Sequence, residues 1–350
     1  MYMRIINLIS KRIKVAILIT AAFSFLTISQ NIIAQEVDYS GTSAANFLKI
    51  GVGARPMAMG DAAISTVTDP TAMYWNVAAL TRVEDDFSVA ISSMDWLVET
   101  RNSYISSALR VEGLGSFGID IQYLDYGKVE ETTVYDQNGT GRFLSANDFS
   151  FGLGYARKLT DRFSFGVKVK YIQETIANAS ASGVGFDVGA VFNTTFFDNN
   201  LWLAASLANF GSKMKFDGRD LAVTYSVPGS PSGKQIPADL TTIEWEIPLL
   251  FRFGISNYFV KNEDLSVLVS YDVLDSRDYD VRHNLGTEVG IMNSFYLRGG
   301  YKINYDEVTY TIGAGLDFKN ILDYNIQLDY LYLDYGVFSS LNQFTIRMGL

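Results

Sequence analysis

The feature that most constrains this chain is an alternation of apolar and polar side chains with a period of two residues, which recurs from residue 86 to the end. Residues 163–171 show it plainly, because Phe, Phe, Val, Val and Tyr alternate there with Ser, Gly and two Lys. A period of two places each set of side chains on its own face of a β-sheet. The sequence therefore predicts a sheet with one large apolar face and one face of Gly, Ser and charged residues.

Fourteen strands can be counted in this region, each nine to fourteen residues long. Such strands are long for a soluble sheet, but they match a tilted strand that crosses a bilayer. A soluble sandwich, the alternative, would have shorter strands and would turn its apolar face inward. The expected strands are residues 87–97, 101–111, 115–125, 146–158, 162–174, 182–195, 200–210, 247–257, 262–273, 280–292, 294–303, 308–318, 323–334 and 342–350.

The connections between these strands alternate in length. After the even strands, no expected turn exceeds four residues, and the last of them is 319–322. The two longest gaps, 126–145 and 211–246, both follow odd strands. An outer-membrane barrel has this pattern, with short periplasmic turns and longer outer loops. The four prolines after residue 86 lie in or beside the longest gap, and none falls in the middle of an expected strand.

We therefore predict an all-β fold, a 14-stranded antiparallel transmembrane β-barrel over residues 86–350, in contact with outer-membrane lipid. A sheet can span a bilayer only as a closed barrel, because lipid cannot satisfy an open strand edge. Phe165 and Val167 should face lipid. The charged residues of the opposite face allow two interpretations. They either line a path for a substrate or ion, or form an ion-paired interior that holds the segment before the barrel, residues 35–85. We favour the second interpretation. This set is Lys168, Lys170, Asp187, Arg252, Asp272, Glu288, Arg298, Asp317, Asp329 and Arg347.

The first 34 residues have the pattern of an export signal. Four basic residues lie before residue 15, and a short apolar stretch over 15–28 precedes a small residue, Ala34. This order is typical of a secretory signal peptide, and the apolar stretch is short for a spanning helix. We expect a signal peptide over residues 1–34.

Residues 35–85 lack the alternation of apolar and polar side chains, and they are rich in small side chains. Asp69-Pro70 suggests a helix cap followed by proline, and so a helix over 71–80. A segment of this kind before a barrel indicates a hatch, or plug, inside the lumen, where glycines let the backbone pass close to the wall. Its candidate motif residues are Gly51, Gly53, Arg55, Met59, Gly60, Asp61, Asp69, Trp75 and Asn76.

The motif over residues 45–62, followed by residues 69–76, resembles the PorV/PorQ family of outer-membrane proteins. That family is similar to FadL-type transporters, which are fourteen-stranded barrels with an N-terminal hatch. The family's usual Trp-Asn-Pro-Ala is here Trp75-Asn76-Val77-Ala78, so any kink set by that proline is in doubt. The resemblance implies an outer-membrane location in a Gram-negative cell. It also implies a link to type 9 protein secretion, with secretion-system components or the C-terminal domains of exported cargo as partners.

Composition excludes several function classes. The chain has no Cys and a single His, so cysteine-based catalysis and Cys-based zinc sites are excluded. A formal net charge of −10 opposes binding to nucleic acid. We expect no enzyme activity, cofactor or metal, because His283 has no serine or carboxylate placed beside it. The aspartates of 275–280 lack the pattern of a calcium loop, so we expect them to form a solvated loop.

Two functions remain open: a barrel that binds or escorts secretion cargo at the cell surface, and a FadL-like passive channel for a hydrophobic small molecule. The longest connection, 211–246, carries apolar residues that join no expected strand, so we predict that it binds a partner or forms a lid over the barrel mouth. These residues are Leu221, Val223, Tyr225, Ile236, Leu240 and Trp245.

Overall fold

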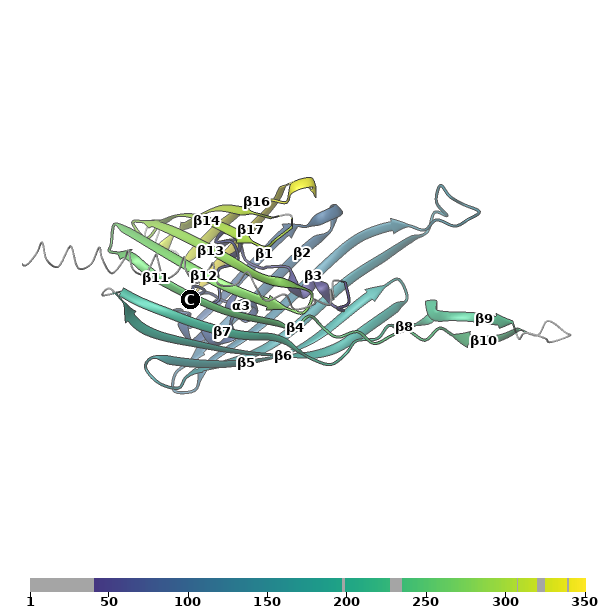
Figure 1. Ribbon diagram of the computed structural model, residues 1–350, viewed down its shortest axis with the longest axis horizontal. Coiled ribbons are helices and arrows are strands. Elements are labelled where there is room, and N and C mark those ends of the chain that lie inside the picture. The colour runs from purple at the N-terminus through teal and green to yellow at the C-terminus, as the bar shows by residue number, and fades with distance from the viewer. Residues whose placement is uncertain (1–40, 197–198, 227–234, 307, 320–324, 339) are drawn as a thin grey trace, which may run out of the picture. The chain divides into compact units, whose positions relative to one another are not determined.

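The computed structural model describes residues 41–196, 199–226, 235–306, 308–319, 325–338 and 340–350. Within them, fourteen strands form one closed antiparallel barrel, because each barrel strand pairs with the next along the chain and β1 pairs with β17 (Figure 1). The predicted fold class is confirmed. The barrel strands are β1 (Phe87–Asp95), β2 (Arg101–Val111), β3 (Gly115–Glu130), β4 (Phe143–Lys158), β5 (Phe163–Ile176), β6 (Ala179–Phe196), β7 (Asn199–Gly211), β11 (Leu250–Lys261), β12 (Leu265–Ser276), β13 (Tyr279–Ile291), β14 (Phe295–Ile303), β15 (Tyr310–Asp317), β16 (Ile326–Asp334) and β17 (Ser340–Gly349).

The remaining elements are short. Strand β8 (Asp217–Gly218) pairs with β6, while β9 (Ala222–Ser226) and β10 (Gln235–Asp239) form a separate two-stranded sheet. None of the described helices is long and apolar enough to cross a membrane. They are η1 (Asn46–Lys49), α2 (Ala54–Ala58), α3 (Ala72–Trp75), η2 (Val77–Arg82), η3 (Leu97–Glu99), η4 (Arg219–Leu221) and η5 (Gly336–Phe338).

Strands β3 and β4 extend beyond the expected boundaries, which leaves 131–142 as the loop in place of 126–145. The alternation breaks after Asp125 because the strand has a β-bulge there, with Gly127 at a φ of 73°. Pairing resumes beyond the bulge, where Lys128 lies opposite Ser145. A bulge adds one residue to one strand and shifts the side-chain alternation, so the sequence pattern ends before the strand does.

Two further expectations need correction. The turn expected at 319–322 is longer, because β15 ends at Asp317 and β16 begins at Ile326. Pro237 lies inside β10, although no strand was expected there. The β9–β10 sheet has only two strands, so both are edge strands, and an edge strand tolerates a proline on its unpaired side.

The two faces of the barrel wall follow the predicted alternation. Phe165 and Val167 are 39% and 43% exposed on the outer face, whereas Lys168 is 4% exposed and faces the lumen. Glycine and small polar side chains continue the inner face on neighbouring strands. The lumen therefore has room for a segment of chain, and the hatch segment fills it.

The described part of the hatch segment, residues 41–85, lies in the lumen and forms most of the buried apolar core. Helix α2 packs against β14 to β17, and η2 packs against β3 to β6, which lie across the barrel. The helix expected over 71–80 is divided at Asn76, whose extended backbone ends α3 and whose side chain accepts a hydrogen bond from Ala78 at the start of η2. The expected signal peptide, residues 1–34, lies outside the described residues.

Candidate functional site

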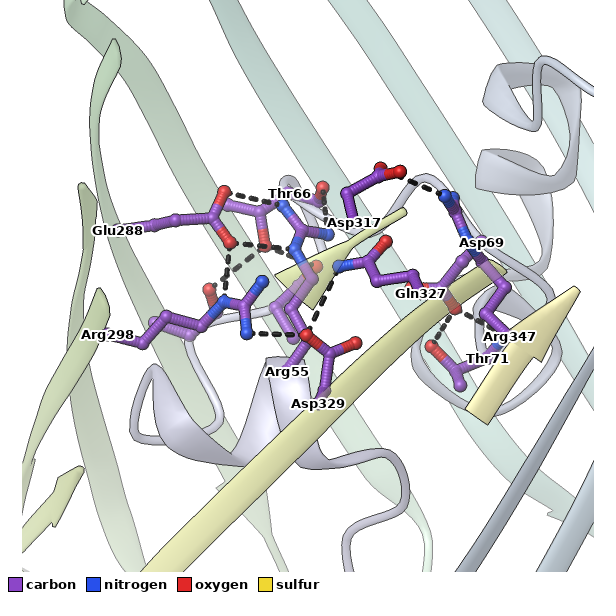
Figure 2. Close-up of polar contacts among 12 residues, drawn as sticks. Arg55, Thr66, Asp69, Thr71, Glu288, Arg298, Asp317, Gln327, Asp329 and Arg347 are labelled. Atoms are coloured by element: carbon purple, nitrogen blue, oxygen red, sulfur yellow. Dashed lines mark hydrogen bonds and ion pairs between the residues drawn. The ribbon is translucent and has the colours of Figure 1, made fainter. Parts of the chain in front are cut away.

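A chain of buried charges ties the hatch segment to the barrel wall. Arg55 of α2 donates to both carboxylate oxygens of Glu288 on β13, at 2.9 and 3.1 Å. Arg298 on β14 donates to the same carboxylate at 2.6 Å and to Asp329 on β16 at 2.6 Å, as Figure 2 shows. These two cations and two anions balance one another, so a buried cluster can remain charged.

Two more ion pairs hold the hatch segment on the same side of the barrel. Asp61 pairs with Lys302 of β14, and Lys49 pairs with Asp278 at 2.7 Å. Ser43 also donates to Asp278. Our prediction that the aspartates of 275–280 form a solvated loop is therefore wrong for Asp278, which is buried and anchors the hatch segment.

Other motif residues shape the hatch segment itself. The indole N–H of Trp75 donates to the carbonyl of Val52 at 2.9 Å, and the side chain of Asn76 donates to the wall at the carbonyl of Ala190 at 3.1 Å. Asp69 accepts from the backbone N–H of Thr71 at 2.8 Å, two residues on, which is the hydrogen bond of a helix cap, although α3 itself begins at Ala72. The motif residues thus lie together in the lumen and fix the path of this segment.

The motif glycines lie where the backbone turns or approaches its surroundings closely. Gly53 and Gly60 have φ angles of 82° and 65°, which residues with a side chain rarely adopt. Gly51 lies beside Met57, and Met59 is fully buried. At the wall, a Cβ on Gly300 would lie 2.0 Å from the backbone nitrogen of Gly60. Hatch and wall are therefore in backbone contact on this side.

A second buried charge cluster lies on β3 to β6. Lys168 contacts Asp120 at 2.7 Å and donates to the hatch carbonyl of Met73 at 3.0 Å, while Lys170 pairs with Asp187 at 2.9 Å. Asp120 was absent from the predicted lumen set, although it follows Ser116 and Gly118 at intervals of two residues, which places it on the same inner face. These contacts support the interpretation that the lumen charges hold the hatch segment.

The hatch segment leaves a cavity at each end of the barrel, and the two cavities share no lining residue. The cavity of about 1010 Å³ lies at the end with the short turns, including 112–114, and it is lined by ten basic and six acidic side chains. Arg82 of η2 is one of them, and its guanidinium lies 3.9 Å from the ring centre of Trp202. Burial lowers the pKa of Arg82 to about 10, with the nearby charge of Arg55 acting in the same direction.

The cavity at the other end has a volume of about 770 Å³ and a more apolar lining. Aromatic side chains come from both hatch and wall, with basic side chains packed over some of the rings. Arg282, for example, lies 3.5 Å from the ring centre of Tyr279. The aromatic lining consists of Phe47, Tyr74, Trp75, Trp96, Tyr126, Tyr279, Tyr305 and Tyr335.

The predicted partner-binding residues lie mostly on one face of the β9–β10 hairpin. Tyr225 lies opposite Ile236, and Val223 lies opposite Ala238. The backbone hydrogen bond from Leu240 to Leu221 continues this register. Tyr225, Ile236 and Leu240 are 50%, 38% and 56% exposed. Trp245 lies apart, in a bridge to Met214, and is 43% exposed.

His283 lies on the outer face of β13 and has Tyr271 as its partner. The Tyr271 hydroxyl is 2.7 Å from Nδ1 of His283, and the rings stack. Among the residues that the structure describes, no three His, Cys, Asp or Glu side chains gather as a metal site.

Comparison with known proteins identifies the family. The sequence model described as "Type IX secretion system protein PorV" matches residues 19–228, more than half of the chain. This chain belongs to the PorV family. It is therefore an outer-membrane β-barrel protein of the type IX secretion system. No curated protein sequence matches it.

Solved structures confirm the FadL-like fold of this PorV-family chain. A crystal structure of the Pseudomonas putida toluene transporter TodX has a TM-score of 0.53 at 15% identity, covering 90% of this chain and 98% of the transporter. The Ralstonia pickettii toluene transporter TbuX has a TM-score of 0.51 at 14% identity, covering 85% and 97%. At these identities the likeness concerns the fold alone.

Proposed function

We propose that this barrel binds the C-terminal domain of exported cargo at the cell surface, through the apolar face of the β9–β10 hairpin. The exposure of that face is the observation that carries the proposal. Leu221, Val223 and Tyr225 share it with Ile236 and Leu240, and the strands pair only with each other in the described residues. Contiguous exposed apolar surface on a stable protein usually marks an interaction site.

Two features of the hairpin suit protein recognition. Its outer strand edges carry unpaired backbone groups, so an extended segment of a partner can add to the sheet. Tyr225 supplies a large ring at 50% exposure, and tyrosine is common among the residues that dominate binding energy. The exposure of these side chains favours a docking surface over a lid on the barrel mouth.

The test places a charge on each face of the hairpin. Tyr225→Lys with Ile236→Lys disrupts the apolar face, whereas Thr224→Lys alters the neighbouring exposed position on the other face. Loss of a central apolar pair costs about 2 kcal/mol or more, which is about thirtyfold in Kd. We expect that loss of affinity for a purified cargo C-terminal domain in the double variant, with the control close to the native protein.

Secretion of signal-bearing cargo should fall in the same double variant. Equal affinities in all three proteins would refute the role of this face, provided that the variants still fold as barrels.

The aromatic cavity at the same end favours a second candidate, a passive channel for a hydrophobic small molecule. Its rings, including Trp96 and Tyr335, could enclose an apolar solute of modest size. Uptake of a hydrophobic solute by liposomes that contain the barrel distinguishes the two. Two results together would favour the channel. Uptake must exceed that of empty liposomes and persist in the hairpin double variant, and that variant must bind cargo as tightly as the native protein.

A further inference from the structure

The cavity at the short-turn end differs in charge from the chain that forms it. The chain carries a formal net charge of −10, yet ten basic and six acidic side chains line this cavity. A concave surface with an excess of one sign of charge concentrates the electric field and attracts counter-ions. We call this cavity the basic vestibule.

Most basic side chains of the basic vestibule have no carboxylate partner among the described residues. Arg55, Arg298 and Arg347 form ion pairs. The other seven form none: Arg82 donates to the carbonyl of Ser65, Arg110 donates to backbone carbonyls, and the rest lie on the rim. The rim residues are Arg157, Lys158, Arg162, Lys261 and Lys319. Four acidic side chains of the lining also form no ion pair among the described residues: Glu84, Asp85, Glu112 and Asp161. Seven unpaired cations against four unpaired anions leave the basic vestibule with an excess of positive charge.

Two buried donors in this lining also lack hydrogen-bond acceptors. Nη2 of Arg298 and Nε of Arg347 have no partner, although the Arg298 side chain is fully buried. Arg347 lies 3.8 Å from Asp317, beyond hydrogen-bond distance (Figure 2). A buried donor without an acceptor is costly, so an acceptor that enters here, directly or through water, stabilises the site.

We propose that the basic vestibule binds a phosphate group presented from the periplasmic side, independently of the hairpin. Arg82 lines the cavity with its guanidinium against Trp202, and the exposed side chains of Arg157, Lys158 and Arg162 line the rim. Guanidinium groups match the geometry of phosphate oxygens and bind them in pairs of hydrogen bonds.

The amount of charge favours phosphate over carboxylate. One carboxylate brings a single negative charge, whereas a phosphate monoester carries about −1.5 to −2 at neutral pH and offers three acceptor oxygens. Several unpaired cations around one cavity match the larger charge and the three acceptor oxygens of a phosphate group. The ligand can come from a soluble phosphate compound or from a phospholipid headgroup, and both have this chemistry.

The experiment uses the full chain, purified in detergent, and two probes: inorganic pyrophosphate and dihexanoyl phosphatidic acid below its micelle concentration. Calorimetric titration at low salt should give saturable binding of at least one probe. Arg82→Gln should weaken it by about tenfold or more, because a hydrogen bond to a charged group contributes about 1.5–3 kcal/mol. Added sodium chloride should weaken it further through screening.

Arg101→Gln is the matched control, because this exposed arginine lies outside the basic vestibule. It should leave the Kd within about twofold, well under the 1.4 kcal/mol of a tenfold change. The double variant Arg157→Gln with Arg162→Gln changes exposed rim positions only, so it tests the site even where Arg82→Gln fails to fold.

Binding of pyrophosphate alone identifies a soluble ligand, and binding of the lipid alone identifies a headgroup. Either result supports the proposal. It is overturned if neither probe binds saturably, or if the rim variant binds as tightly as the Arg101→Gln control.

Discussion

Two ion pairs of nearly equal length allow a direct measurement of what holds the hatch segment. Arg55 and Glu288 are 2.9 Å apart with side chains 12% and 6% exposed, whereas Arg101 and Asp95 are 3.0 Å apart with side chains 65% and 80% exposed. Each pair is measured by a double-mutant cycle, which compares two single variants with the double variant. The buried cycle uses Arg55→Gln and Glu288→Gln, and the exposed cycle uses Arg101→Gln and Asp95→Asn. The distance between the charged groups is nearly the same in both cycles, so the cycles differ in burial.

The expected magnitudes differ because of the surroundings. Breaking a buried pair costs about 3–5 kcal/mol, since it leaves a charge uncompensated, whereas an exposed pair contributes about 0–1 kcal/mol. Glu288→Gln should lie at the upper end, because Arg55 then has no carboxylate partner and Arg298 keeps only Asp329. Arg55→Gln should lie at the lower end, because Glu288 keeps its 2.6 Å contact with Arg298.

The assay is equilibrium unfolding in urea, in lipid or detergent, with the free energy extrapolated linearly to water. The buried cycle should give a coupling energy of about 1–3 kcal/mol, as interacting neighbours do. The exposed cycle should give a coupling close to zero. Equal coupling in both cycles would refute the reasoning, because it would mean that burial of the hatch contact does not matter.

Three further expectations use the same unfolding measurement. Gly300→Ala places a Cβ against the hatch backbone and should cost about 1–3 kcal/mol, whereas at Gly299, where the nearest atom is 4.0 Å away, the change should stay within about 0.5 kcal/mol. Similar losses at both would place the hatch segment elsewhere. Trp75→Phe leaves the Val52 carbonyl without its donor and should cost about 1–3 kcal/mol; a neutral result would mean that water replaces the bond. Val167→Arg puts a charge on the lipid face and should cost about 2–4 kcal/mol; a change near zero would contradict that placement.

The barrel could be predicted from sequence because its determinant is local. Alternation at period two fixes which side chains face lipid, and a membrane-spanning sheet must close, so strand number and topology follow. The boundaries failed where a local exception interrupts the pattern. Gly127 sits in the bulge that hides the end of β3, and Pro248 lies before β11, which begins three residues later than expected and ends at Lys261.

The hatch contacts could not be predicted, because their partners lie far apart in the chain. Arg55 and Glu288 are separated by 233 residues, and no local pattern pairs them. The division of the expected helix at Asn76 could not be predicted either. Its neighbours have helical propensity, but the side chain of Asn76 caps the following turn and so divides the helix. A hydrogen bond from this side chain to the wall at Ala190 stabilises the same conformation. The hairpin residues were predicted, whereas their shared face required the strand register.

The lumen contacts bear directly on the two candidate functions. The hatch segment lies between the two cavities, which share no lining residue. A solute that passes from one cavity to the other through the lumen therefore displaces the hatch segment. Displacement breaks the buried pairs of Arg55, Asp61 and Lys49 with the wall. If one such loss costs about 3–5 kcal/mol, an open state that breaks even one pair is populated at about one part in a hundred or less, since each 1.4 kcal/mol is a factor of ten. Cargo binding on the exposed hairpin carries no such cost, and so recognition at the mouth agrees better with this lumen than passive conduction through it.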